Sequence, residues 1–106
     1  MNIYFDYLLE NFGGAHLIGA KIISELIADY DITNLFKAYH DYAKDNDIKY
    51  HNVERAIRHY IQVIDSTRGI ENTLKCKCFN GKNFSNKEFL ATVKVRAEEY
   101  KCQENI

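Results

Sequence analysis

The stretch that decides the fold is His51-Asn52-Val53-Glu54-Arg55-Ala56-Ile57-Arg58-His59-Tyr60-Ile61-Gln62-Val63-Ile64. On a helical wheel at about 100° per residue, with Arg55 at zero, five apolar side chains gather between about 140° and 240°. These are Val53, Ile57, Tyr60, Ile61 and Ile64. The spacing predicts a long helix from about His51 to Thr67, closed by Arg68-Gly69, that buries this stripe.

The opposite side of the same predicted helix is polar. Six side chains lie within about 60° of zero on the wheel, and Glu54 lies at their flank. The six are His51, Asn52, Arg55, Arg58, His59 and Gln62. The helix is therefore expected to present two Arg, two His and two amides away from the core.

The rest of the chain also carries helical signals. It contains no Pro and five Gly, so long helices can form without interruption. Helices are predicted at about 4–11, 15–29, 33–44, 70–79 and 85–100, with a turn at 80–83. Together with the long helix they make about six helices and no strands, an all-α fold in one domain spanning residues 1–106.

Local residues set the expected helix ends. Gly13-Gly14 should stop the first helix, and Thr33 is the expected N-cap of the third. Ser85-Asn86-Lys87-Glu88 has the form of a capping box, which predicts the start of the last helix. Five residues are expected on the buried side of the third helix: Leu35, Phe36, Tyr39, Tyr42 and Ala43.

Composition narrows the class of protein. The chain has 106 residues, 46% of them hydrophobic, and a net charge of −1. No apolar run reaches the roughly 18 residues that span a bilayer, and the start does not resemble a secretory signal, so a cytoplasmic protein without a membrane partner is expected.

The charge is distributed unevenly along the chain. Residues 1–47 carry three Lys against eight acids, a net of −5, and residues 48–106 carry eleven bases against seven acids, a net of +4. Such a split favours a basic surface for phosphate or an acidic partner.

Metal sites and catalysis are not expected. Cys76 and Cys78 are one residue apart, and no second pair of Cys or His completes a zinc site; Cys102 is the third thiol. The four His share no recognisable motif with a nucleophile and an orienting group. We therefore expect no cofactor, no metal and no enzyme activity.

The polar face of the long helix suits the DNA major groove. Arg can donate two hydrogen bonds to guanine, Asn and Gln can pair with adenine, and Glu54 could accept from cytosine. The third predicted helix, a short turn at Ile48-Lys49-Tyr50 and the long helix have the proportions of a helix-turn-helix. The competing interpretation is a solvated amphipathic helix in which Glu54 and Arg58 form a surface ion pair.

Four segments resemble the C-terminal DNA-binding domain of the sporulation initiation response regulators, the stage 0 sporulation protein A family. Asn52 to His59 contains the residues of the family's recognition-helix signature V-E-R-A-I-R-H. His16-Leu17-Ile18-Gly19 is similar to its H-[IL]-x-G, Tyr42-Ala43-Lys44 to its I-A-K, and residues 85–91 to its T-N-S-E-F-I-A. The matching segments occur in the same order over about residues 8–97.

The resemblance implies a winged-helix-like effector domain without strands, which binds promoter boxes in double-stranded DNA and regulates transcription in sporulation. By position, Glu54, Arg55 and Arg58 match residues that face bases. Neighbouring positions are expected to approach phosphates: Lys49, His51, Asn52, His59 and Gln62. The resemblance also implies pairing of adjacent domains or a homodimer through the last helix, about 86–100, and contact with RNA polymerase.

The chain also departs from the family pattern. The family's receiver domain does not fit into this length, so a free-standing regulator is expected. Asn52 replaces a basic residue, residues 45–47 replace a more basic stretch, and Phe84 replaces a Pro. Loss of cations weakens the salt-dependent part of DNA binding. These departures, with the acidic first half, motivate the alternative function: a protein-interaction module that pairs with a full-length regulator and modulates it.

Overall fold

The structure, a computed structural model, describes residues 2–14, 16–70 and 84–104. Over these ranges the chain forms five α-helices and one 3₁₀ turn, and no strand. The elements are α1 (Ile3–Asn11), α2 (Ile18–Asp29), the 3₁₀ turn η1 (Ile32–Asn34), α3 (Leu35–Asp45), α4 (Tyr50–Arg68) and α6 (Asn86–Glu104). The all-α prediction is confirmed. The described residues form five of the about six helices that were predicted for the chain, and the short helix predicted at 70–79 lies, apart from Ile70, outside the described residues.

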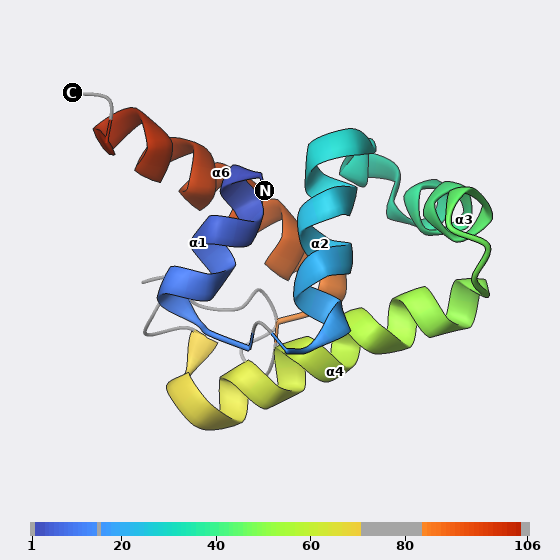
Figure 1. The fold of residues 1–106 in the computed structure, drawn as a ribbon, viewed down its shortest axis with the longest axis horizontal. Coiled ribbons are helices and arrows are strands. Elements are labelled where there is room, and N and C mark those ends of the chain that lie inside the picture. Colours follow the sequence, from blue (N-terminus) through green and yellow to red (C-terminus); the bar gives the residue numbers. More distant parts are fainter. Residues whose placement is uncertain (1, 15, 71–83, 105–106) are drawn as a thin grey trace.

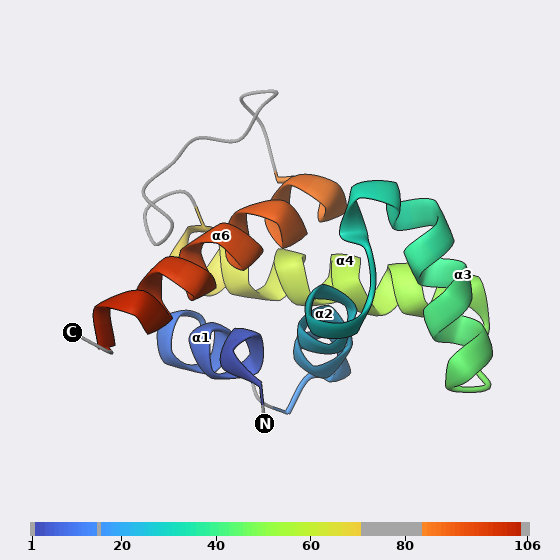
Figure 2. The same cartoon turned by 90° about the horizontal axis from the view of Figure 1, so that it is seen from above.

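The longest helices frame the molecule. In Figure 1, α4 lies along the lower edge, α1 and α2 stand side by side above it, and α3 lies at the end where α4 begins. α6 runs obliquely behind α1 and α2 in Figure 1, and the view from above in Figure 2 shows it beside α1. α2 packs against both α1 and α4, and α6 packs against α1. None of the helices in the described ranges combines the length and apolar character needed to cross a membrane.

The predicted stripe of α4 forms the centre of the core. Its five apolar side chains are all buried, as the wheel predicted. They belong to one cluster of buried residues to which α1, α2, α3 and α6 also contribute. The largest of these, with less than 2% exposure, include Leu8, Ile23, Leu26, Phe89, Leu90 and Val93. Burial of aliphatic and aromatic side chains at about 25 cal/mol per Å² is the main source of stability for such a domain.

Two predicted helix ends are confirmed by their geometry. The backbone of Gly13 has φ 73°, and its N–H donates to the carbonyls of Leu8 and Leu9 at the end of α1. Glycine adopts this left-handed conformation without steric cost, so the helix ends there. At the start of α6, the Ser85 hydroxyl accepts from the Glu88 N–H at 3.1 Å and the Ser85 N–H donates to the Glu88 carboxylate at 3.3 Å. This reciprocal pair is the predicted capping box.

The start of the second helix was predicted wrongly. α2 begins at Ile18, about one turn after the predicted start at Ala15. The reason is a turn, in which Gly14 has φ 75° and the Leu17 N–H donates to the Gly14 carbonyl at 2.9 Å. Leu17 itself is extended, so the helical backbone starts only after it.

The cap of the third helix was also misassigned. Asn34, and not Thr33, caps α3, because its side chain accepts from the Lys37 N–H at 3.3 Å. Thr33 lies inside η1, where both its N–H and its hydroxyl donate to the Asp31 carboxylate. The Thr33 hydroxyl is therefore directed back to Asp31, two residues earlier, and the Asn34 side chain caps α3.

Phe36 does not lie in the core as predicted. Its relative exposure is 66%, while Tyr39, Tyr42 and Ala43 of the same helix are buried. The Phe36 ring instead packs on the rings of His40 and Tyr50, with centroid distances of 4.4 and 5.6 Å. It forms part of an aromatic cluster at the surface between α3 and the start of α4.

Gly19 brings α2 into backbone contact with α4. A Cβ atom at Gly19 would lie 2.5 Å from the Ala56 carbonyl oxygen and 2.5 Å from the Tyr60 Cβ, which no real side chain tolerates. The Tyr60 hydroxyl donates to the Gly13 carbonyl at 2.9 Å and ties the same region to the end of α1. These contacts fix the rotation of α4 and hence which of its side chains face outward.

Candidate nucleic-acid interface

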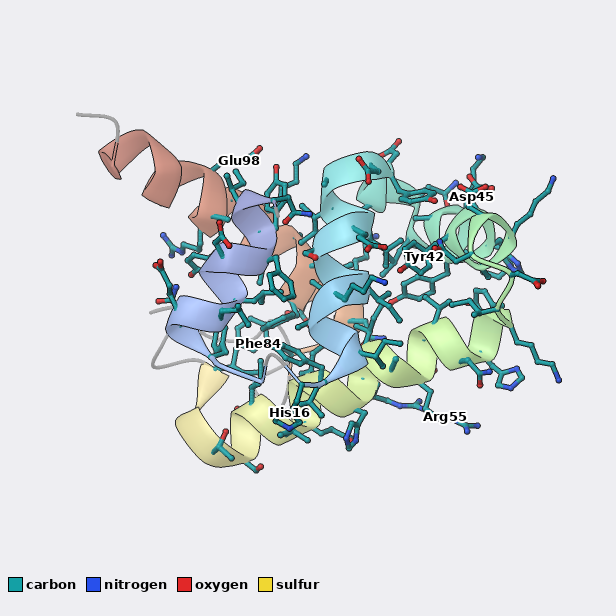
Figure 3. All side chains as sticks on the ribbon, viewed as in Figure 1. His16, Tyr42, Asp45, Arg55, Phe84 and Glu98 are labelled. Carbon is teal, nitrogen blue, oxygen red and sulfur yellow. The ribbon has the colours of Figure 1, made fainter. Side chains whose placement is uncertain are left out.

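The outer face of α4 is the most distinctive polar surface in the described part of the chain. We define it by the six predicted residues His51, Asn52, Arg55, Arg58, His59 and Gln62, all of which are exposed. In Figure 3 the labelled Arg55 side chain extends below α4, away from the body of the molecule. The outer face and the buried stripe of α4 thus lie on opposite sides of one helix, as the wheel predicted.

Glu54 occupies a different position from the two Arg. It is half-buried, and its carboxylate pairs with the Arg58 guanidinium at 3.3 Å, one turn further along α4. The side chain of Arg58 remains 54% exposed, so this pair is solvated and contributes only about 0.3–0.5 kcal/mol. The Glu54–Arg58 surface ion pair of the competing interpretation is therefore present in the structure. Because the pair is weak and exposed, the Arg58 guanidinium could leave Glu54 for another anion.

The connection between α3 and α4 is short and well defined. It spans residues 46–49, and Asp47 within it has φ 54°. The Ile48 N–H donates to the Ala43 carbonyl at 3.0 Å, which folds the chain back on the end of α3. Lys49 follows in extended conformation, exposed at the start of α4.

A groove lies on one flank of α4, with a volume of about 660 Å³. We call it the α4–α6 groove, because α4 forms one wall and the start of α6 the other. Its lining residues are Leu35, Tyr39, Glu54, Arg58, Ile61, Gln62, Asp65, Ser66, Phe84, Ser85, Asn86 and Lys87. Arg58 and Gln62 belong both to the groove and to the outer face, so the two surfaces are continuous.

The groove also contains an unsatisfied polar group. The Tyr39 hydroxyl is buried and has no hydrogen-bond partner in the part of the chain that the structure describes. Burial raises the pKa of Tyr39 to about 12. The Asn86 amide lies close enough to the hydroxyl to oppose this rise, but the two groups do not meet hydrogen-bond geometry. The Asn86 amide makes its hydrogen bond elsewhere, donating to the Glu54 carbonyl at 3.5 Å.

The sequence predicted the outer face but missed the groove. Every predicted base or phosphate residue lies on α4 or directly before it, and periodicity within one helix was sufficient to group them. Ser85, Asn86 and Lys87 meet α4 only through tertiary packing, since Asn86 and Glu54 are 32 residues apart in sequence. The capping box located the start of α6, but no local signal places that start beside Arg58.

Metal-binding residues do not gather in the described ranges, where no group of three or more His, Cys, Asp or Glu side chains could hold an ion. Cys76 and Cys78, and the side chain of Cys102, lie outside what the structure describes. His16 lies exposed in the connection before α2.

Comparison of the chain with protein-family models, with curated proteins and with solved structures gave no match.

Proposed function

We propose that this protein is a sequence-specific DNA-binding transcription regulator that places α4 in the major groove. The single observation that supports the proposal best is the division of α4 into a fully buried apolar stripe and an exposed face rich in Arg, His and amides. The proposal also agrees with the resemblance of residues 52–59 to the recognition-helix signature of the sporulation regulators. In this proposal α3, the turn at 46–49 and α4 act as the helix-turn-helix.

The dimensions of α4 suit this role. At about 1.5 Å per residue, its 19 residues make a helix of about 28 Å. The major groove of B-DNA is about 12 Å wide and admits an α-helix with its side chains. Because α4 forms the lower edge of the molecule in Figure 1, no other described helix stands between its outer face and a duplex.

Within the proposed complex, Arg55 is the principal base reader. It is exposed, and its guanidinium could donate two hydrogen bonds to guanine O6 and N7. Arg58 is the second reader, held by Glu54 until a base or phosphate replaces that carboxylate. The proposed phosphate contacts are Lys49, His51, Asn52, His59 and Gln62, all exposed.

Selection of bound sites from random DNA duplexes tests this function. The wild-type protein should enrich one motif, and Arg55→Ala should weaken binding to it by about 1–3 kcal/mol and relax the preference at one base. Arg96→Ala is the matched control, because Arg96 lies on α6 and pairs with Glu99 at 3.4 Å. Equal affinity for selected and scrambled duplexes would contradict the proposal.

A second candidate is a protein-interaction module that pairs with a full-length regulator. The observation that favours it is the exposed Val95, with 53% exposure beside the exposed Ala91 one turn earlier on α6. The same surface would serve a homodimer, tandem pairing on DNA or a contact with RNA polymerase. Co-purification of a full-length regulator with wild-type protein but not with Val95→Glu, together with no DNA binding at low salt, would favour this candidate over the first.

A further inference from the structure

We propose that the α4–α6 groove binds the sugar-phosphate backbone of the bound DNA, and that Lys87 contacts a phosphate of that backbone. This inference rests on the proposed DNA-binding function and assigns a second element, α6, to the same interface. It adds a residue that lies 29 positions after the last base reader Arg58 and on another helix.

The position of the groove supports a backbone contact. A helix with its side chains is about 10–12 Å across, so α4 fills the major groove and the elements beside it meet the phosphates at the groove edge. The α4–α6 groove lies on such a flank: Gln62 and Ser66 line it, and both are exposed on α4. A strand that borders the base-reading face therefore runs past the start of α6.

The charges of the groove favour an anion at one place. Lys87 is exposed and makes no ion pair with any residue in the described ranges. The lining also holds two carboxylates: Glu54 pairs with Arg58, and Asp65, near the end of α4, keeps its charge and accepts from the Ile70 N–H at 3.1 Å. Of the two described cations that line the groove, Arg58 is paired with Glu54, whereas Lys87 has no carboxylate partner among the described residues.

Uncharged donors stand next to Lys87. The Ser85 hydroxyl accepts from the Glu88 N–H through its oxygen, so its own O–H remains able to donate. The Asn86 amide donates to the Glu54 carbonyl through a long hydrogen bond of 3.5 Å. Serine, asparagine and lysine are side chains that commonly contact DNA phosphates, and such contacts set the register of a protein without reading sequence.

The salt dependence of binding tests this inference with Lys87→Gln. Loss of one phosphate contact should reduce the slope of log affinity against log salt by about 0.9. Affinity should fall by the same factor on the selected and the scrambled duplex, and the selected motif should not change. Lys87→Glu should weaken binding further, because it places a negative charge at the phosphate.

Lys94→Gln is the matched control, since Lys94 lies about two turns further along α6, close to Asp31 and outside the groove. It should leave the salt slope close to the wild-type value. If the wild-type protein binds its motif and Lys87→Gln keeps the wild-type salt slope, the proposed phosphate contact of Lys87 is wrong, while the proposed DNA-binding function stands. If the wild-type protein binds no DNA, both proposals fail.

Discussion

Two tyrosines on α3, three residues apart, differ in one hydrogen bond. The Tyr42 hydroxyl donates to the Glu25 carboxylate of α2 at 2.6 Å, whereas the Tyr39 hydroxyl is buried without a partner in the described chain. Both rings are buried. The pair therefore separates the contribution of the ring from that of the hydroxyl.

Tyr42→Phe should lower the free energy of unfolding by about 1–2 kcal/mol, because it removes a hydrogen bond to a charged acceptor. Tyr39→Phe should leave it unchanged or raise it slightly, because no hydrogen bond is lost and a buried polar group is removed. Urea denaturation of both variants measures the difference, and each serves as the control for the other. Equal destabilisation would show that Tyr39 has a partner that supports the fold.

At the scale of single elements, the α2–α4 crossing depends on one residue. Gly19→Ala places a Cβ against the Ala56 carbonyl and Tyr60, so the two helices must separate. We expect overpacking to lower the free energy of unfolding by about 1–3 kcal/mol. The higher helix propensity of Ala should offset up to about 1 kcal/mol of this loss. Thermal or urea unfolding measures it, with the exposed Lys21→Ala on the same helix as the control. A Gly19→Ala protein as stable as the control would mean that the crossing tolerates a side chain.

The elements also show what sequence can and cannot predict. Periodicity identified α4 and its buried stripe because both are properties of one helix, and the capping box located α6 because its two residues are close in sequence. Phe36 was misplaced because its apolar character is satisfied by neighbouring rings at the surface, which periodicity does not distinguish from the core. The sequence also contained no sign of the role of Gly19, since that role depends on Ala56 and Tyr60 of α4, which lie about 40 positions later.

For the whole molecule, tyrosine ionisation predicts sensitivity to alkali. Burial raises the pKa of Tyr39 to about 12, a hydrogen bond to Asp45 raises that of Tyr30 to about 12, and burial also raises the pKa of Tyr42. Their ordinary pKa is 10.0. Above that value the unfolded chain loses tyrosine protons that the folded protein keeps, so the folded state is favoured less as the pH rises.

Stability should therefore fall as the pH rises from about 10 to 12. Urea denaturation at a series of pH values measures the fall, and the ultraviolet absorbance of tyrosinate reports the ionisation. Tyr42→Phe should reduce the pH dependence, because it removes one of the tyrosines whose pKa is raised. A fall in stability that begins well below pH 10 would assign the effect to other groups.

The backbone contact at Gly19 limits how this protein can be regulated. Side chains that repack between helices are what allow one helix to slide or rotate between two stable positions. Gly19 itself lies directly against the Ala56 carbonyl and the first carbon atoms of the Tyr60 side chain, and it offers no side chain of its own to repack. We therefore expect α2 and α4 to respond to any effector as one rigid unit, so that control acts by covering or uncovering the outer face of α4 and not by changing its orientation.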